Sequence, residues 1–327
     1  MGAQKVIFTR VVIFKNLNIP IEELEGGMFV APYDMPPWRP PSEAYSVLIR
    51  VTRGCPWNRC AFCAMYKDIK FQVKSLEEIE RDLEAALQVY GPEASTVFIG
   101  DSDSLVTKVD FIVEVLALIK RYFPTLSRIT SYTRGRTLAN RSLEDLERLR
   151  GAGLDRLHVG LETGDSWLLK YIRKGLTPEE MMRGGEKAIK AGFQLSLYVL
   201  LGIGGEDRWE EHALGTARVL NRVSPHFIRL RTFIPIPGTL MYERIQRGEF
   251  VLAPPLTVLK ETRLMLENLD CTSMFLSDHI SNYAYIEGRL PHDKEEMLRD
   301  LDRIIAQLEA SPHLLKVLRD RHKSAHL

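Results

Sequence analysis

The chain has 327 residues, of which 45% are hydrophobic and 27% charged, and its formal net charge is +1. This composition is typical of a soluble chain with one or two cores, and the near-neutral charge argues against a general affinity for DNA. Arg10 interrupts the first apolar stretch, so no secretory signal is expected, and the most apolar run, residues 195–203, is too short to span a membrane. We therefore expect a cytoplasmic protein without membrane insertion.

The first 45 residues predict an N-terminal extension. They contain the proline-rich stretch Met-Pro-Pro-Trp-Arg-Pro-Pro at residues 35–41, which favours extended backbone. We expect this extension to lie across the body that follows.

From residue 46 onward, a unit of one apolar strand and one helix repeats six times. Ser75 and Glu78 form a capping box that opens the first helix, and Ser142 and Thr177 with Pro178 mark later helix starts. The predicted strands cover residues 46–52, 96–99, 128–132, 157–161, 193–201 and 227–231. The predicted helices cover residues 75–90, 109–122, a segment after 142, a stretch ending near 175, a segment from 177, and residues 206–221.

This alternation predicts an α/β fold with a parallel sheet and right-handed crossovers. Periodicity alone leaves two architectures open, a doubly wound open sheet and a curved partial barrel. In both, ligands bind at the carboxyl ends of the strands. Residues 241–327 are predicted to form a mostly helical extension that closes the open side, with a polar break at residues 277–290.

Three of the four cysteines, Cys55, Cys60 and Cys63, lie within nine positions. Thiolates at this density bind zinc or an iron–sulfur cluster. A structural zinc site needs a fourth ligand, which among the cysteines only the distant Cys271 could supply. Three thiolates on a [4Fe–4S] cluster would leave one iron open. We favour the cluster over zinc and over plain buried thiols, and the clustering predicts a reducing compartment.

With Phe62 directly before its last cysteine, this loop resembles the cluster loop of the radical S-adenosylmethionine (radical SAM) enzymes. Four residues separate its first two cysteines, where the commonest family loop has three. The resemblance implies a partial (β/α)6 TIM-like barrel over residues 46–240, and a [4Fe–4S] cluster whose open iron binds S-adenosylmethionine beside Phe62. It further implies reductive cleavage to methionine and a 5′-deoxyadenosyl radical, with flavodoxin or ferredoxin as a possible electron donor.

The strand ends resemble further parts of that family's cofactor site. Gly100 and Asp101 stand where the family has a glycine-rich motif, and Asp101 could accept hydrogen bonds from the methionyl ammonium. Glu162, with Lys174 twelve residues later, resembles the ligand contacts of relatives of anaerobic coproporphyrinogen dehydrogenase. Gly202 ends a strand similar to the one that flanks adenine. The structural alternatives are a salt bridge for Glu162 and a helix-capping turn at Asp101.

Two residues are predicted to face a substrate. Arg231 alternates with Arg229 in the last strand, and because both cannot lie unpaired in the core, we expect at least one at the barrel mouth. The alternative is a buried pair with Glu162 or Asp101. His279 lies in a polar stretch that should fold over the same mouth, although a lone histidine is more often structural.

The function that follows is hydrogen abstraction from a small-molecule substrate. RNA or protein substrates are alternatives, as is a non-catalytic iron–sulfur or cofactor-trafficking protein. A carrier would have no need of the adenosyl pocket that the Glu162 and Gly202 strands resemble, so we favour the enzyme.

Overall fold

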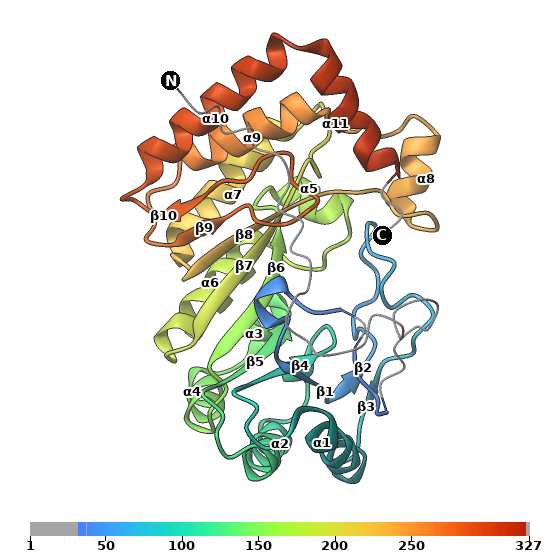
Figure 1. Ribbon diagram of the computed structural model, residues 1–327, viewed down its shortest axis with the longest axis vertical. Helices are drawn as coiled ribbons and strands as arrows, with labels where there is room; N and C mark the ends of the chain where they lie inside the picture. Colours follow the sequence, from blue (N-terminus) through green and yellow to red (C-terminus); the bar gives the residue numbers. More distant parts are fainter. Residues whose placement is uncertain (1–31, 37, 325–327) are drawn as a thin grey trace, which may run out of the picture. The chain divides into compact units, whose positions relative to one another are not determined.

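The computed structural model describes residues 32–36 and 38–324, and the elements below belong to the unit Tyr33–Leu327. In this part of the chain an eight-stranded sheet has the order β1-β4-β5-β6-β7-β8-β9-β10 (Figure 1). Neighbouring strands from β1 to β9 are parallel, and β10 is antiparallel to β9. The predicted α/β fold, a partial TIM-like barrel, is confirmed. The sheet strands are β1 (Val47–Arg50), β4 (Thr96–Gly100), β5 (Arg128–Thr133), β6 (Arg156–Glu162), β7 (Gln194–Leu201), β8 (Phe227–Thr232), β9 (Met274–Leu276) and β10 (Glu287–Arg289).

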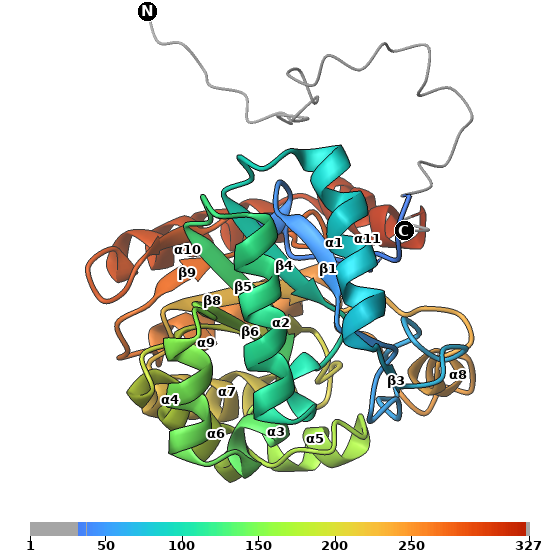
Figure 2. The ribbon, with the colours of Figure 1, turned by 90° about the horizontal axis from the view of Figure 1, so that it is seen from below.

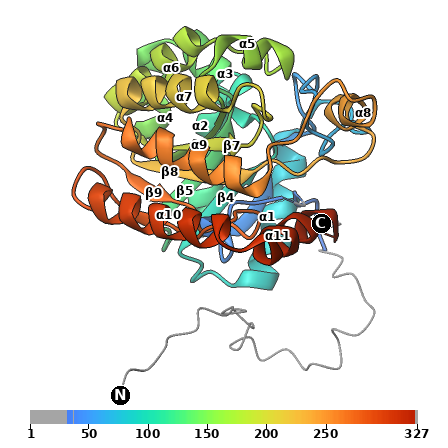
Figure 3. The same ribbon diagram turned by 90° about the horizontal axis from the view of Figure 1, so that it is seen from above.

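A row of helices covers the outer face of the sheet (Figures 2 and 3). In this row α1 packs against α2, α2 against α4, α4 against α6, α6 against α7, α7 against α9, and α9 against α10. In the described residues no helix combines the length and the apolar character that crossing a membrane requires. The helices are α1 (Leu76–Tyr90), α2 (Val109–Tyr122), α3 (Gly135–Asn140), α4 (Leu143–Gly151), α5 (Ser166–Tyr171), α6 (Pro178–Lys190), α7 (Trp209–Val223), α8 (Leu240–Gln246), α9 (Pro255–Glu267), α10 (Lys294–Glu309), α11 (Pro312–Ser324), and the short 3-10 helices η2 (Pro41–Glu43) and η3 (Ser104–Val106).

Helix starts follow the capping residues of the sequence. Ser75 accepts a hydrogen bond from the Glu78 N–H, and the Glu78 carboxylate accepts one from the Ser75 N–H. Thr177 and Glu180 form the same reciprocal pair at α6, and Ser142 caps α4. These side chains satisfy N–H groups that the first helical turn leaves unbonded, so the predicted starts are confirmed.

The two faces of the sheet carry different side chains because alternate residues of a strand point in opposite directions. Leu157 and Val159 of β6 belong to the hydrophobic core beneath the helices. His158 between them faces Tyr198 of β7 and Tyr132 of β5 on the barrel side. The side chains around His158 on the barrel side are therefore polar and aromatic, whereas the layer beneath the helices is hydrophobic.

The C-terminal extension is not only helical. Phe275 of β9 pairs with Ile228 of β8, and Gly288 of β10 pairs with Phe275, so the extension adds two strands to the sheet. The sequence prediction missed both strands, because each has three residues and lies within or beside a polar stretch. In the described residues the sheet has its two edges at β1 and β10. The predicted N-terminal extension lies outside the described residues up to residue 31.

Candidate functional site

The cysteine loop, residues 54–71, follows β1 at the carboxyl edge of the sheet. Its two ends are joined by β2 (Thr52–Arg53) and β3 (Gln72–Val73), which pair antiparallel. Within the loop, the Ala61 N–H donates a hydrogen bond to the Ile172 carbonyl at 2.8 Å. The Ala61 carbonyl accepts a hydrogen bond from the Met241 N–H at 2.9 Å. Its three cysteines are partly exposed and free of disulfides. The loop is thus closed at its base and anchored at its middle.

The four-residue spacing between Cys55 and Cys60 forms an ordered turn. Asn58 has a left-handed φ of 44°, which asparagine adopts more readily than most residues, and its N–H donates to Cys55 Sγ at 3.3 Å. Its side-chain amide donates to the Tyr66 carbonyl across the loop at 2.5 Å. The Cys63 N–H still reaches the Cys60 carbonyl at 3.4 Å, so the extra residue is accommodated locally.

Trp57, within that spacing, ties the loop to the segment after α5. Its indole N–H donates to the Arg173 carbonyl at 2.8 Å. Its ring lies over Gly175, where a Cβ would come within 2.5 Å of the ring. Gly175 also has a φ of 68°, so glycine is required there for conformation and for space. Because Lys174 lies between these two contacts, the clamp also sets the position of Lys174 beside the loop.

Asp101 supports the start of the cysteine loop. Its carboxylate is fully buried, with Oδ2 accepting from the Gly54 N–H at 2.7 Å and Oδ1 from the Arg50 guanidinium at 3.1 Å. Burial raises the pKa of Asp101, although Arg50 opposes this effect. The sequence suggested that Asp101 meets the ammonium group of a ligand. The structure instead uses its carboxylate to hold the residue before Cys55.

The strand end at Gly100 is covered by the N-terminal segment. A Cβ at Gly100 would lie 2.2 Å from the side chain of Pro36. Asp34 of the same segment contacts Arg50 at 2.7 Å and Arg53 at 2.5 Å. The segment therefore covers the carboxyl ends of β1 and β4 at residues 34–36, with Pro36 packed directly on Gly100.

Glu162 and Lys174 form an ion pair at the end of β6. The strand is irregular between Gly160 and Glu162, and Glu162 has a φ of 64°, a strained conformation that clusters at functional sites. Glu162 Oε1 accepts from Lys174 Nζ at 2.6 Å, with the two side chains 14% and 13% exposed. Burial would lower the pKa of Lys174, but the Glu162 carboxylate raises it.

Gly160 makes room for this pair, because a Cβ there would lie 2.2 Å from Glu162 Oε1. The salt bridge considered as the structural alternative for Glu162 is therefore present. Its partner is the second residue that the sequence predicted to bind the cofactor. The same pair lies close enough to Cys60 and Cys63 to affect the pKa of both thiols.

Gly202 directly follows β7 and has a φ of 75°. Its N–H donates to the buried carboxylate of Glu261 at 2.9 Å, so this glycine serves the contact with α9, and its N–H is not directed at a ligand. Phe62 of the cysteine loop packs against a hydrophobic cluster that contains Ile203, and Leu200 of β7 packs against the same cluster. The aromatic residue of the loop therefore shares a hydrophobic cluster with residues at the end of β7.

The polar stretch after β9 folds over the end of β8, as the sequence predicted. The Thr232 N–H donates to Ser281 Oγ at 3.0 Å. The Arg231 guanidinium lies over the Tyr198 ring, 5.4 Å from its centroid. Burial, together with the nearby Arg231, lowers the pKa of His279 to about 4. The structure therefore brings Arg231 and His279 together at the barrel mouth.

The alternative considered for Arg229 and Arg231 of β8, a buried pair with an acidic residue at another strand end, is wrong. Within the described residues neither pairs with Glu162 or Asp101, and Arg229 instead contacts Asp278 at 3.5 Å. Buried polar atoms without partners are rare in proteins, yet several occur on strand residues that alternate with the hydrophobic core. In the described part of the chain these include Arg128 Nε, Thr130 Oγ1 and Arg229 Nε.

Sequence reasoning missed a hydrogen-bonded chain inside the barrel. Glu43 Oε1 lies 3.2 Å from His158 Nε2, and the Tyr198 hydroxyl lies 3.2 Å from His158 Nδ1. The Tyr132 ring packs edge-on against His158 with centroids 5.9 Å apart. The sequence did contain a signal for His158, Tyr198 and Tyr132. Each lies between two positions that face the helices, so period-two alternation places its side chain on the barrel side of the sheet. Glu43 gave no such signal because it comes from η2.

The donor set fits an iron–sulfur cluster and not the zinc site considered above. Cys271 lies before β9, at the amino edge of the sheet, and contacts Ser273, so it cannot complete a site with the cysteine loop. Burial raises the pKa of Cys60 to about 11, and Lys174 acts against this effect. A neighbouring cation favours the thiolate form that iron requires.

A sequence model of the radical SAM superfamily matches residues 49–217. The chain is similar to the heme chaperone HemW of Bacillus subtilis, with 24% identity over 195 residues, which is 59% of this chain and 50% of the relative. It is also similar to biotin synthase of Sulfurihydrogenibium sp., with 26% identity over 196 residues, 59% of this chain and 56% of the relative. The chain spans about half the length of these curated relatives.

Solved structures to which the chain is similar include methylornithine synthase PylB, with a TM-score of 0.49 and 19% identity over 80% of this chain and 84% of that one. Coproporphyrinogen III oxidase HemN of Escherichia coli has a TM-score of 0.49 and 17% identity, over 57% of this chain and 44% of that one.

Proposed function

The chain belongs to the radical SAM superfamily, and we propose that it is an enzyme whose cysteine loop holds a [4Fe–4S] cluster. The observation that carries the proposal is the placement of three free thiols on one closed loop beside the Glu162–Lys174 pair. When bound, the cluster would cleave S-adenosylmethionine reductively into methionine and a 5′-deoxyadenosyl radical that abstracts hydrogen from substrate. An electron donor such as flavodoxin or ferredoxin would supply the electron.

Each part of the loop has a role in this proposal. Cys55, Cys60 and Cys63 would be the iron ligands. The Asn58 turn and the Trp57 clamp keep the three thiols in a fixed arrangement before the metal arrives. Such preorganisation limits the conformational entropy that is lost when a site is filled.

Glu162 and Lys174 would contact S-adenosylmethionine. The carboxylate complements its ammonium group, and the Lys174 ammonium complements its carboxylate. Until the ligand binds, each charge satisfies the other at 2.6 Å, so neither is left unpaired in a half-buried position. Phe62 would pack beside the ligand against the end of β7.

The substrate would be a polar small molecule held on the barrel side of the sheet. Arg231 offers a fixed positive charge, and His279 offers an uncharged imidazole at neutral pH because its pKa is about 4. The unpartnered polar atoms of β5 and β8 support a substrate with hydrogen-bonding groups. Tyr198, fixed by His158, adds a phenol to the same interior.

The test is anaerobic reconstitution with iron and sulfide, followed by reduction with dithionite and assay for 5′-deoxyadenosine. We expect a brown protein that forms this product from S-adenosylmethionine. Cys60→Ser should form none, and Cys271→Ser should behave as the unchanged chain. A protein that binds one zinc and no iron would overturn the proposal.

The similarity to a protein named as a heme chaperone favours one second candidate, a non-catalytic protein that carries a cluster and transfers a cofactor. Both candidates predict a brown protein. They differ in the assay above, because the carrier would bind its cluster and still form no 5′-deoxyadenosine.

A further inference from the structure

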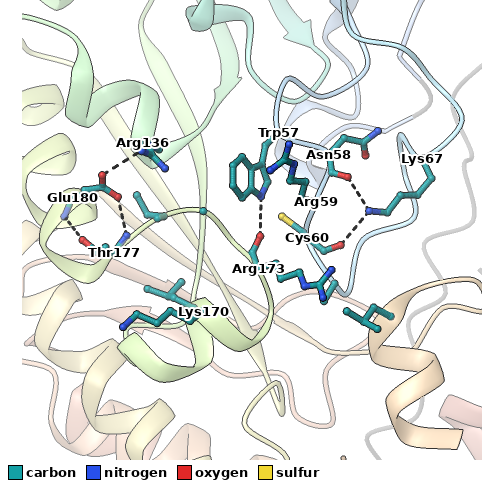
Figure 4. A pocket seen from close by; sticks show the side chains of 15 residues that line it. Trp57, Asn58, Arg59, Cys60, Lys67, Arg136, Lys170, Arg173, Thr177 and Glu180 are labelled. Carbon is teal, nitrogen blue, oxygen red and sulfur yellow. Dashed lines mark hydrogen bonds and ion pairs between the residues drawn. The ribbon is translucent and has the colours of Figure 1, made fainter. Parts of the chain in front are cut away.

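An open groove of about 860 Å³ lies between the cysteine loop and helices α3, α5 and α6 (Figure 4). Trp57 and Cys60 form part of its wall on the side of the loop. Lys170 of α5 and the start of α6 form the opposite side. A molecule in the groove would therefore lie against one of the proposed cluster ligands without entering the barrel.

The groove is strongly basic although the chain as a whole is nearly neutral. Its cations are all exposed, and among the described residues only one of them has a carboxylate partner, Glu180, 3.9 Å from Arg136. The net charge of the whole chain is +1, so the positive potential is local to this face. The five cations are Arg59, Lys67, Arg136, Lys170 and Arg173.

We propose that this groove is the docking site of an acidic electron-donor protein, an inference that rests on the proposed function. The donor would be a flavodoxin: one electron would leave its reduced flavin and enter the cluster, and no bond or group would be transferred. Electron-transfer partners form small, transient interfaces, and complementary charge raises their association rate. A basic groove whose wall contains Cys60 meets both requirements.

The groove fits an acidic protein better than RNA. Proteins that bind single-stranded nucleic acid stack its bases on aromatic rings. Here Trp57 already packs against two guanidinium groups, those of Arg59 at 5.3 Å and Arg134 at 5.2 Å from its ring centroid. Its indole N–H is also taken by the Arg173 carbonyl.

The first test is a binding titration of the full-length chain with an acidic flavodoxin at low ionic strength. Lys170→Glu combined with Arg136→Glu should weaken binding about tenfold or more, and added salt should reduce the difference. The matched control, Lys190→Glu combined with Arg218→Glu, makes the same charge change at exposed positions on α6 and α7. It should bind as the unchanged chain does.

The second test follows reduction of the reconstituted cluster by stopped-flow absorbance. The Lys170 and Arg136 double variant should be slow with reduced flavodoxin but normal with reduced methyl viologen, a small cation that needs no docking site. The proposal is overturned if the unchanged chain does not bind flavodoxin, or if the control variant loses binding equally.

It is also overturned if the double variant loses affinity for a short RNA while its binding and reduction by flavodoxin stay normal. Failure to assemble a cluster would contradict the proposed function instead. In that case the binding titration still decides whether the groove is the docking site.

Discussion

The Gly54 N–H donates a hydrogen bond of 2.7 Å to Oδ2 of Asp101, so the end of β4 fixes the residue that precedes the first cysteine. Arg50, on the neighbouring strand β1, contacts the other oxygen of the same carboxylate and also Asp34. Because Asp101 is fully buried, its charge is tolerated only with these partners. A residue that resembles a ligand contact in the sequence thereby shapes the cysteine loop.

We predict that Asp101→Ala lowers both stability and cluster content. Arg50 would keep Asp34 as a partner, so the cost should stay below the roughly 3–5 kcal/mol of a buried pair whose remaining charge is left unpaired. Gly54 would lose its acceptor. Urea unfolding and iron analysis after reconstitution measure the two effects. Asp101→Asn is the control, because it can still accept from Gly54 and should retain more iron than the alanine variant. Full iron content with weakened S-adenosylmethionine binding would indicate a ligand contact instead.

This relationship shows where the sequence was informative and where it was not. The start of α1 was predictable because Ser75 and Glu78 are three residues apart and act locally. The partners of Asp101 are 47 and 51 residues away, and which of several nearby cations it meets depends on strand order and register. The sequence shows that a charged residue follows a buried strand and therefore needs a polar or oppositely charged partner, but it does not show which residue is that partner.

The loop cysteines give the most direct metal prediction. We expect Cys55→Ser, Cys60→Ser and Cys63→Ser each to lose most of the iron, because each removes one of three thiolates. Cys271→Ser should keep about four irons and four sulfides per chain, as a cubane cluster requires. Iron and sulfide analysis of anaerobically reconstituted protein measures this. Equal iron loss in all four variants would show that Cys271 is also needed.

The Glu162–Lys174 pair can be separated into structural and ligand-binding roles. Glu162→Gln should weaken S-adenosylmethionine binding to the reconstituted protein by about ten- to a hundredfold, or roughly 1.5–3 kcal/mol, because a charged hydrogen bond is lost. It should also destabilise the fold, since Lys174 is left unpaired at 13% exposure. Equilibrium dialysis and urea unfolding measure the two effects.

The double variant Glu162→Gln with Lys174→Met provides the control, because it removes both charges. Its stability should exceed that expected from adding the two single effects, while its affinity for S-adenosylmethionine stays low. If the double variant binds the ligand as tightly as the unchanged chain, the pair has only a structural role.

The groove and the barrel interior were beyond sequence reasoning for a common reason. Each is built from several elements, and no element carries a recognisable signal alone. In the sequence Lys170 and Arg136 look like ordinary exposed helix residues. The basic groove forms only because the fold brings α3, α5 and the cysteine loop together. By contrast, the approach of His279 to Arg231 was predictable, because a polar stretch in a helical extension was expected to fold over the strand ends.

The last prediction concerns the pH dependence of stability at His279. Burial and Arg231 lower its pKa from an ordinary value of 6.5 to about 4. Between these values the unfolded chain binds more protons at this site than the folded chain, so the His279 contribution to stability falls as the pH drops from about 6.5 toward 4. In His279→Gln this contribution is absent, while titrations elsewhere in the chain are common to both proteins. Urea unfolding midpoints of the two proteins between about pH 4.5 and 7.5 should therefore diverge on acidification, with the unchanged chain losing more stability. A constant difference across this range would mean that His279 is not buried beside Arg231, and its proposed place at the substrate would be withdrawn.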